Sequence, residues 1–211
     1  MKRSIMAFFN FLVFSIILMI TLSGCKTSVN HDAYSEIYER YNEIKSYTAV
    51  ATIETASNKA TNTYKVKQYY TAPDKYRMDV MDGDNNVKTS YIFNGANVYL
   101  KSANGGTTNI ENYVVQDKDY MFIPDFFKSY YGSEESFAEA SNNMSGEQTR
   151  LNSEAKTPNP KRNSQSVWID NKTYVPSKLE TYDVDNTAVI TVKYEEFKLN
   201  EKIEDKMYKN N

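Results

Sequence analysis

Cysteine and histidine are almost absent from this sequence, which has one of each among 211 residues. A single cysteine excludes an intrachain disulfide, and the two residues cannot supply the several ligands of a zinc site. The lone histidine, His31, is also the only candidate base for a serine nucleophile. Among the seven glycines, Gly105-Gly106 lacks the lysine and the helix of a phosphate-binding loop. These absences exclude most metal, disulfide and nucleophilic chemistry.

Charge also gives no strong functional signal, because 25 basic and 27 acidic residues leave a formal net charge of −2. No segment concentrates basic residues on one face, so nucleic acid is not an expected partner. The adjacent acidic pairs Glu134-Glu135 and Glu195-Glu196 are poor candidates for a glycosidase site, since neighbouring side chains of a strand point to opposite faces. The sequence therefore predicts a protein that is not an enzyme, with no catalytic residue, metal or cofactor.

The N-terminus has the pattern of an export signal. Lys2 and Arg3 precede an uncharged, mostly apolar stretch over residues 4–24. About 20 apolar residues would also span a bilayer, so an uncleaved transmembrane anchor is the alternative. The stretch Leu22-Ser23-Gly24-Cys25 resembles a bacterial lipobox, in which cleavage precedes a lipid-modified cysteine. We therefore expect residues 1–24 to be a lipoprotein signal peptide and Cys25 to carry the lipid.

Lipidation of Cys25 also sets the expected domain plan and localisation. Two acyl chains hold a protein stably on a membrane, whereas a single chain is marginal. We expect an extracytoplasmic protein anchored through Cys25, with residues 25–31 as a polar tether that contains His31. Residues 32–211 are then long enough for one domain.

Periodicity in this domain predicts an α+β fold. Residues 32–47 place apolar side chains at helical spacing, with Asp32 as the N-cap. From Tyr47 the period changes to two, and strands separated by Asp-Gly, Asn-Gly and Asp-Asn turns follow. A second short helix is expected over residues 124–132, and the polar stretch 141–165 is expected to be a flexible loop. These elements predict a curved antiparallel sheet with the helices covering its concave face.

Some aromatic residues allow two interpretations. Buried, they fill the core; exposed, they form a binding surface, because aromatic side chains dominate interface energies. We expect core packing for Phe126, Phe127, Tyr130, Tyr131 and Trp168.

Two short motifs resemble a known family. Residues 72–77, Ala-Pro-Asp-Lys-Tyr-Arg, fit its Pro-x-Lys-aromatic-Arg strand. Its later hairpin motif is matched by Trp168, Asp170, Thr173 and Pro176. Together these motifs resemble the periplasmic lipoprotein-carrier fold shared by LolA, LolB and the sigma-factor regulator RseB, over most of residues 32–205. The resemblance implies an unclosed β-barrel with helices plugging its mouth.

Within that fold, the chain most resembles the GerS-type germination lipoproteins of spore-forming clostridia. Its Lys, Asn, Tyr and Ile bias is typical of low-GC Gram-positive bacteria, so the anchoring membrane would be that of the Gram-positive cell or forespore. The resemblance implies a non-catalytic regulator, needed for spore germination, that binds a cortex-modifying amidase of the CwlD type.

Two binding modes follow from an unclosed sheet. Its edge strands can pair with a partner or with a second copy in a homodimer, although the sequence does not identify the partner-binding residues. Alternatively, the half-barrel cavity carries a lipid or another hydrophobic ligand. Strands rich in Tyr rather than Leu favour protein contact, since buried Tyr hydroxyls need partners.

Overall fold

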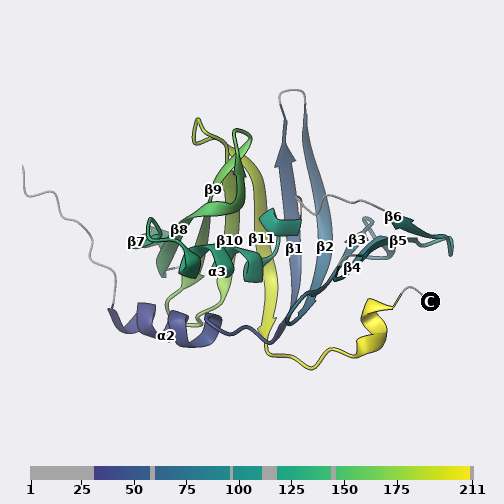
Figure 1. The fold of residues 1–211 in the computed structure, drawn as a ribbon, viewed down its shortest axis with the longest axis horizontal. Helices are drawn as coiled ribbons and strands as arrows, with labels where there is room; N and C mark the ends of the chain where they lie inside the picture. The colour runs from purple at the N-terminus through teal and green to yellow at the C-terminus, as the bar shows by residue number, and fades with distance from the viewer. Residues whose placement is uncertain (1–30, 58–59, 96, 111–117, 144–145, 210–211) are drawn as a thin grey trace, which may run out of the picture.

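An eleven-stranded antiparallel sheet forms the body of the protein (Figure 1). The computed structural model describes residues 31–57, 60–95, 97–110, 118–143 and 146–209. The strands run in the order β6-β5-β4-β3-β2-β1-β11-β10-β9-β8-β7, so β6 and β7 end the sheet. Among the described residues these two end strands do not pair, and the sheet stays open.

The elements follow one another along the chain with few long connections. The strands are β1 (Ser46–Ala56), β2 (Thr61–Thr71), β3 (Lys75–Met81), β4 (Val87–Asn94), β5 (Asn97–Ser102), β6 (Thr107–Ile110), β7 (Phe137–Asn143), β8 (Gly146–Asn159), β9 (Arg162–Asp170), β10 (Pro176–Tyr182) and β11 (Ala188–Leu199). The helical segments are α2 (His31–Tyr41), η1 (Lys118–Tyr120), α3 (Ile123–Gly132) and η2 (Asp205–Tyr208).

Central strand β1 shows the alternation expected from Tyr47 onward. Tyr47, Ala51 and Ile53 are buried, and the residues between the inward positions are half-buried. Ala51 pairs with Val66 of β2 on one side and with Tyr194 of β11 on the other. Because side chains alternate across each strand, these registers align the inward positions into one apolar face.

Both helices pack on that apolar side. α3, which has a proline in its first turn, contacts β8 and buries Phe126 and Phe127. Tyr41 of α2 stacks on Phe127 with the ring centroids 4.6 Å apart, and its hydroxyl donates to the Tyr174 carbonyl oxygen at 2.8 Å. The expected α+β class, an open half-barrel with helices on its concave side, is confirmed (Figure 1).

The polar stretch 141–165 does not form the expected loop. It comprises the end of β7, all of β8 and the start of β9, paired in register. Leu151 and Ala155 are buried, while Ser166 Oγ donates to Asn152 Oδ1 at 2.7 Å. The expectation was wrong because most positions here are small or polar, and their hydrogen-bond partners lie on neighbouring strands.

Two element boundaries also differ by one residue from the expected ones. α2 begins at His31, whose side chain is exposed, so this residue starts the helix and does not belong to the tether. In the β4–β5 hairpin, Asn94 pairs with Asn97, so the loop begins at Gly95. Gly95 has a φ of 59°, a left-handed conformation that glycine adopts without a Cβ penalty.

The C-terminal segment covers part of the outer face of the sheet. Tyr208 is 2 % exposed, and its hydroxyl lies 2.9 Å from Thr71 Oγ1. Arg77 Nη1 of β3 donates to the Met207 carbonyl oxygen at 2.9 Å. Because Arg77 follows the inward Tyr76 along β3, these contacts lie on the side opposite the helices.

The Tyr208 contacts predict a measurable contribution to stability. Tyr208→Ala is expected to lower the free energy of unfolding by about 3 kcal/mol, since it empties a buried aromatic site. Tyr208→Phe, which removes only the hydroxyl, is expected to cost about 1 kcal/mol. Urea denaturation measures both, with Lys206→Ala in the same segment as the surface control. An effect of Tyr208→Ala no larger than that of the control would contradict the packing of this segment.

Candidate functional site

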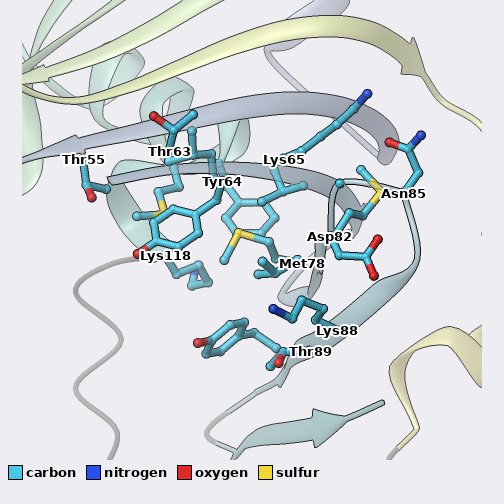
Figure 2. A pocket seen from close by; sticks show the side chains of 18 of the residues that line it. Thr55, Thr63, Tyr64, Lys65, Met78, Asp82, Asn85, Lys88, Thr89 and Lys118 are labelled. Atoms are coloured by element: carbon cyan, nitrogen blue, oxygen red, sulfur yellow. The ribbon is translucent and has the colours of Figure 1, made fainter. Parts of the chain in front are cut away.

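A cavity of about 980 Å³ lies over β1–β4 beside η1 and the start of α3 (Figure 2). This volume is near the upper end of the range for small-molecule sites, about 300–1,000 Å³. The cavity opens on the concave side, because its wall includes the inward residues Ile53, Val66 and Phe93. It is therefore a candidate ligand site that the strand pattern alone did not reveal.

The inner wall of the cavity is apolar. Strand register brings Val66 opposite Val80, and Met78 opposite Tyr91. The segment after η1 adds Met121. Methionine is flexible and polarizable, so such a wall adapts to ligands of irregular shape.

The open side of the cavity is polar and carries Lys88 and Asp82. Figure 2 shows the Lys88 side chain extending into the cavity and the Asp82 carboxylate pointing away from it. Asp82 Oδ1 accepts the N–H groups of Asp84 and Asn86 at 3.0 and 2.9 Å, so this carboxylate holds the β3–β4 turn. Lys88 has no ion pair within the described part of the chain.

A group of four charges, here called the charged cluster, adjoins the cavity: Lys118, Asp119 and Asp125, which are buried, and Lys156, whose side chain is 39 % exposed. Lys118 Nζ donates to Asp125 Oδ2 at 2.9 Å, and Lys156 Nζ donates to Asp125 Oδ1 at 3.1 Å. Lys156 Nζ also reaches Asp119 Oδ1 at 2.9 Å. The Tyr76 ring lies 3.7 Å from Lys118 Nζ, and its hydroxyl donates to Asp125 Oδ1 at 3.2 Å. The cluster is therefore neutral and internally bonded.

The charged cluster changes the proton affinity of Lys156. Burial lowers the pKa of this ammonium, but the carboxylates of Asp125 and Asp119 outweigh the burial and raise its pKa above the usual value. Lys118 of η1 binds Asp125 of α3, and Lys156 of β8 binds both aspartates. These ion pairs hold η1 and α3 on β8.

Side chains from two strands in different halves of the sheet, β2 and β10, hold the segment around η1. Gln68 Nε2 of β2 donates to the Met121 carbonyl oxygen at 3.0 Å, and Thr181 Oγ1 of β10 donates to the Tyr120 carbonyl oxygen at 3.3 Å. The Tyr47 hydroxyl orients Gln68 by donating to its Oε1 at 2.9 Å. α3 is thus held over β8, and the cavity is confined to the β1–β4 half of the concave face.

A second candidate site is the edge strand β7. Asn143 pairs with Gly146 across the two-residue hairpin loop, and such a closing pair is hydrogen-bonded. Because hydrogen-bonded pairs alternate along antiparallel strands, the N–H and C=O groups of Ala138 and Ala140 point away from β8. β7 has neither the proline nor the lysine that often protects an edge, and Phe137 is 55 % exposed. No strand within the described ranges pairs with this side of β7, which makes the edge a candidate for strand addition.

Trp168 lies on the outer face, and the expectation of a core position was wrong. It alternates with the buried residues Val167 and Ile169 and is itself half-buried. Its ring lies 4.9 Å from the Arg150 guanidinium carbon and 3.8 Å from Lys178 Nζ. Period-two alternation places Trp168 outward, where two cations stack on its faces.

The other residues of the later hairpin motif form the β9–β10 turn. Asp170 Oδ1 accepts the N–H groups of Lys172 and Thr173 at 3.0 and 2.8 Å, and the Thr173 hydroxyl at 2.9 Å. Burial raises the pKa of Asp170, but these hydrogen bonds outweigh it and lower the pKa below its usual value. The motif therefore shapes a turn and does not line the cavity.

Phe126, Phe127 and Tyr130 are buried, as expected for core residues, and Tyr131 is half-buried beside them.

The charged cluster was not predicted from the sequence. Its four residues span positions 118 to 156, and an aspartate in the first turn of a helix ordinarily suggests only a dipole interaction.

Several expected site features concern residues outside the described ones. Cys25 and the rest of residues 1–30 are among them. Within the described ranges, no helix is both long enough and apolar enough to cross a membrane. The same ranges contain no group of three or more His, Cys, Asp and Glu side chains placed to hold a metal ion.

Comparisons with solved structures find several proteins of similar architecture. One chain of the Clostridioides difficile CwlD amidase–GerS lipoprotein complex is 23 % identical, with a TM-score of 0.46, and the match covers 81 % of this chain and 96 % of that one. A LolA superfamily protein from Nitrosomonas europaea is 12 % identical, with a TM-score of 0.42 and coverages of 83 % and 96 %. Mycobacterium tuberculosis lipoprotein LppX is 10 % identical, with a TM-score of 0.46 and coverages of 82 % and 96 %.

Sequence comparison assigns the family. A search of curated proteins finds no match. A family model described as "Sporulation protein YdcC-like" matches residues 3–208, nearly the whole sequence. The chain therefore belongs to the YdcC-like family of sporulation proteins.

Proposed function

We propose that this chain is a membrane-anchored, non-catalytic sporulation lipoprotein that binds and regulates a cortex-modifying amidase and is needed for spore germination. In this proposal residues 1–24 are a cleaved signal peptide, Cys25 carries the lipid, and residues 25–30 are a tether that leads into α2. Residues 31–211 are the binding domain, held outside the cytoplasm at the membrane of the cell or forespore.

The open edge of β7 is the observation that supports a protein partner. Strand addition uses main-chain hydrogen bonds for affinity and side chains for specificity. Ala138 and Ala140 offer the outward main-chain groups, and Phe137 offers an exposed aromatic anchor. The same edge would serve a second copy of the chain in a homodimer.

Family membership supports a partner from spore formation. The GerS lipoprotein is seen in complex with the CwlD amidase, and we propose an amidase of that class as the partner here. The amidase would supply the chemistry, while this domain holds it at the membrane.

Ala140→Pro tests the edge directly. Proline removes the outward N–H of Ala140 without removing a β7–β8 ladder bond, so the fold is retained. Loss of one main-chain hydrogen bond predicts amidase binding weakened by about tenfold. The measurement is an affinity pull-down of the full chain from sporulating cells, with the amidase quantified by mass spectrometry.

Ala140→Thr is the matched control, because it keeps the N–H and has a higher strand propensity. It is expected to retain the partner. Equal recovery of the amidase by the proline variant and by the unaltered chain would exclude β7 as the docking strand.

A second candidate function is transport or storage of a hydrophobic ligand. The cavity of about 980 Å³ favours it, because the apolar inner wall is large enough for a lipid chain. The cavity and the β7 edge lie at different parts of the sheet, so the two functions are separately testable.

A further inference from the structure

The cavity over β1–β4 combines an apolar inner wall with a lysine at its open side, Lys88, that has no ion pair among the described residues. We propose that it binds a single-chain amphiphile with an anionic head group, the head at Lys88 and the chain against the apolar wall. This inference rests on the second candidate function, and it adds the charge of the ligand and the residue that selects it.

The apolar wall accounts for the chain. Val66, Phe93 and Phe122 are buried at the inner wall, and Met78 and Met121 lie beside them. A purely polar anion would gain nothing from these side chains. An acyl chain removes apolar surface from water, at about 0.8 kcal/mol for each buried methylene group.

Lys88 differs from the other lysines of the cavity lining in its lack of an ion pair among the described residues. Lys118 is bonded to Asp125 within the charged cluster, and Lys65 pairs with Glu195 at 3.4 Å. Asp82, the acidic residue of the lining, holds the β3–β4 turn through its own Oδ1. Lys88 therefore remains as the lining cation without an ion pair among the described residues.

The position of Lys88 gives the ligand a direction. Its side chain comes from the start of β4 and extends into the cavity (Figure 2). The charged cluster at the inner wall is neutral and fully bonded, so an anion gains nothing by moving deeper. A head group at Lys88 leaves the chain directed toward Met78 and Phe122.

Photo-crosslinking of the full chain in phosphatidylcholine nanodiscs tests the proposal. The probes are diazirine-labelled palmitic acid, its methyl ester and a diazirine-labelled lysophosphatidylglycerol. We expect both anionic probes to label the β3 and β4 peptides about fivefold more than the ester does, the upper range for one half-exposed ion pair. Peptide mass spectrometry locates and quantifies the label.

Two substitutions distinguish the contribution of the Lys88 charge to binding from that of the apolar wall. Lys88→Ala is expected to reduce labelling by the anionic probes about fivefold and to leave ester labelling unchanged. Lys67→Ala, on the exposed outer side of β2, is the matched control and should change neither. Circular dichroism melting curves confirm that each variant is folded.

The labelling results test the selection of an anion and the carrier function separately. Lys88-dependent labelling by one anionic probe alone still supports the proposal and identifies the carboxylate or the phosphate as the source. Equal labelling by acid and ester, or no effect of Lys88→Ala, overturns the selection of an anion but leaves the carrier function standing. No labelling of β3 and β4 by any probe overturns both, while the pull-down of the amidase is unaffected.

Discussion

Above pH 10 the protein is expected to lose stability steeply, because its core contains tyrosines that cannot ionise while it is folded. Burial raises the pKa of Tyr41, Tyr47 and Tyr76 well above 10.0. Burial also raises the pKa of Tyr70, to about 12. Above pH 10 the folded state therefore binds more protons than the unfolded state, and the free energy of unfolding falls as pH rises.

The size of this effect is comparable to the stability of a whole domain. One pH unit above the unfolded value, each tyrosine held neutral costs about 1.4 kcal/mol, so Tyr41, Tyr47 and Tyr76 together remove about 4 kcal/mol. Typical domains have about 5–15 kcal/mol in total. The loss grows to about 8 kcal/mol at pH 12, so unfolding is expected between pH 11 and pH 12, whereas these groups cost little stability below pH 10.

Phenolate absorbance and circular dichroism, recorded together against pH, measure this transition. The buried tyrosines Tyr41, Tyr47 and Tyr76 should ionise together, as secondary structure is lost. Independent titration of all tyrosines near pH 10 with an unchanged dichroism spectrum would contradict the burial described for the core.

Replacing Asp125 should produce the largest loss from a single substitution. The carboxylate is 0 % exposed and accepts hydrogen bonds from Lys118, Lys156 and Tyr76. Asp125→Ala leaves the Lys118 ammonium buried, and Asp119, at 3.4 Å, is then the one carboxylate paired with it among the described residues. Breaking a buried ion pair from one side typically costs about 3–5 kcal/mol, and urea denaturation should show a loss of that size.

A double-mutant cycle distinguishes a charge effect from a packing effect. In a Lys118→Met background, Asp125→Ala should cost less than in the unaltered chain, because one stranded ammonium is gone. Glu36→Ala, which breaks the exposed Glu36–Arg40 pair on α2, is the matched control and should change stability by about 0.5 kcal/mol or less. A loss for Asp125→Ala no larger than that control would show that the cluster contributes little.

The alternation of apolar and polar side chains and the residue types at turns predicted most of the fold that could be predicted. The period-two pattern beginning at Tyr47 predicted the inward face of β1, and the Asp185-Asn186 turn predicted the β10–β11 hairpin, where Asn186 has a φ of 58°. These are local properties, because the pleat and the turn residues act over a few neighbouring positions. The same local patterns did not predict the strands of residues 141–165, since these strands are held by pairing with neighbouring strands.

The candidate site depended on the tertiary structure. No spacing in the sequence links Lys118 with Lys156, or Met78 with Met121, yet each pair meets where η1 and α3 cross the sheet. The availability of Lys88 is equally non-local, because it follows from which neighbouring carboxylates are already bonded. The sequence by itself determined the export pattern, the strand periodicity and the single histidine and single cysteine that limit triad and zinc chemistry, since these are properties of composition and short spacing. Only the packed sheet decided where a cavity remained, which charges of the described residues stayed unpaired and which strands ended the sheet, because those depend on contacts between distant segments.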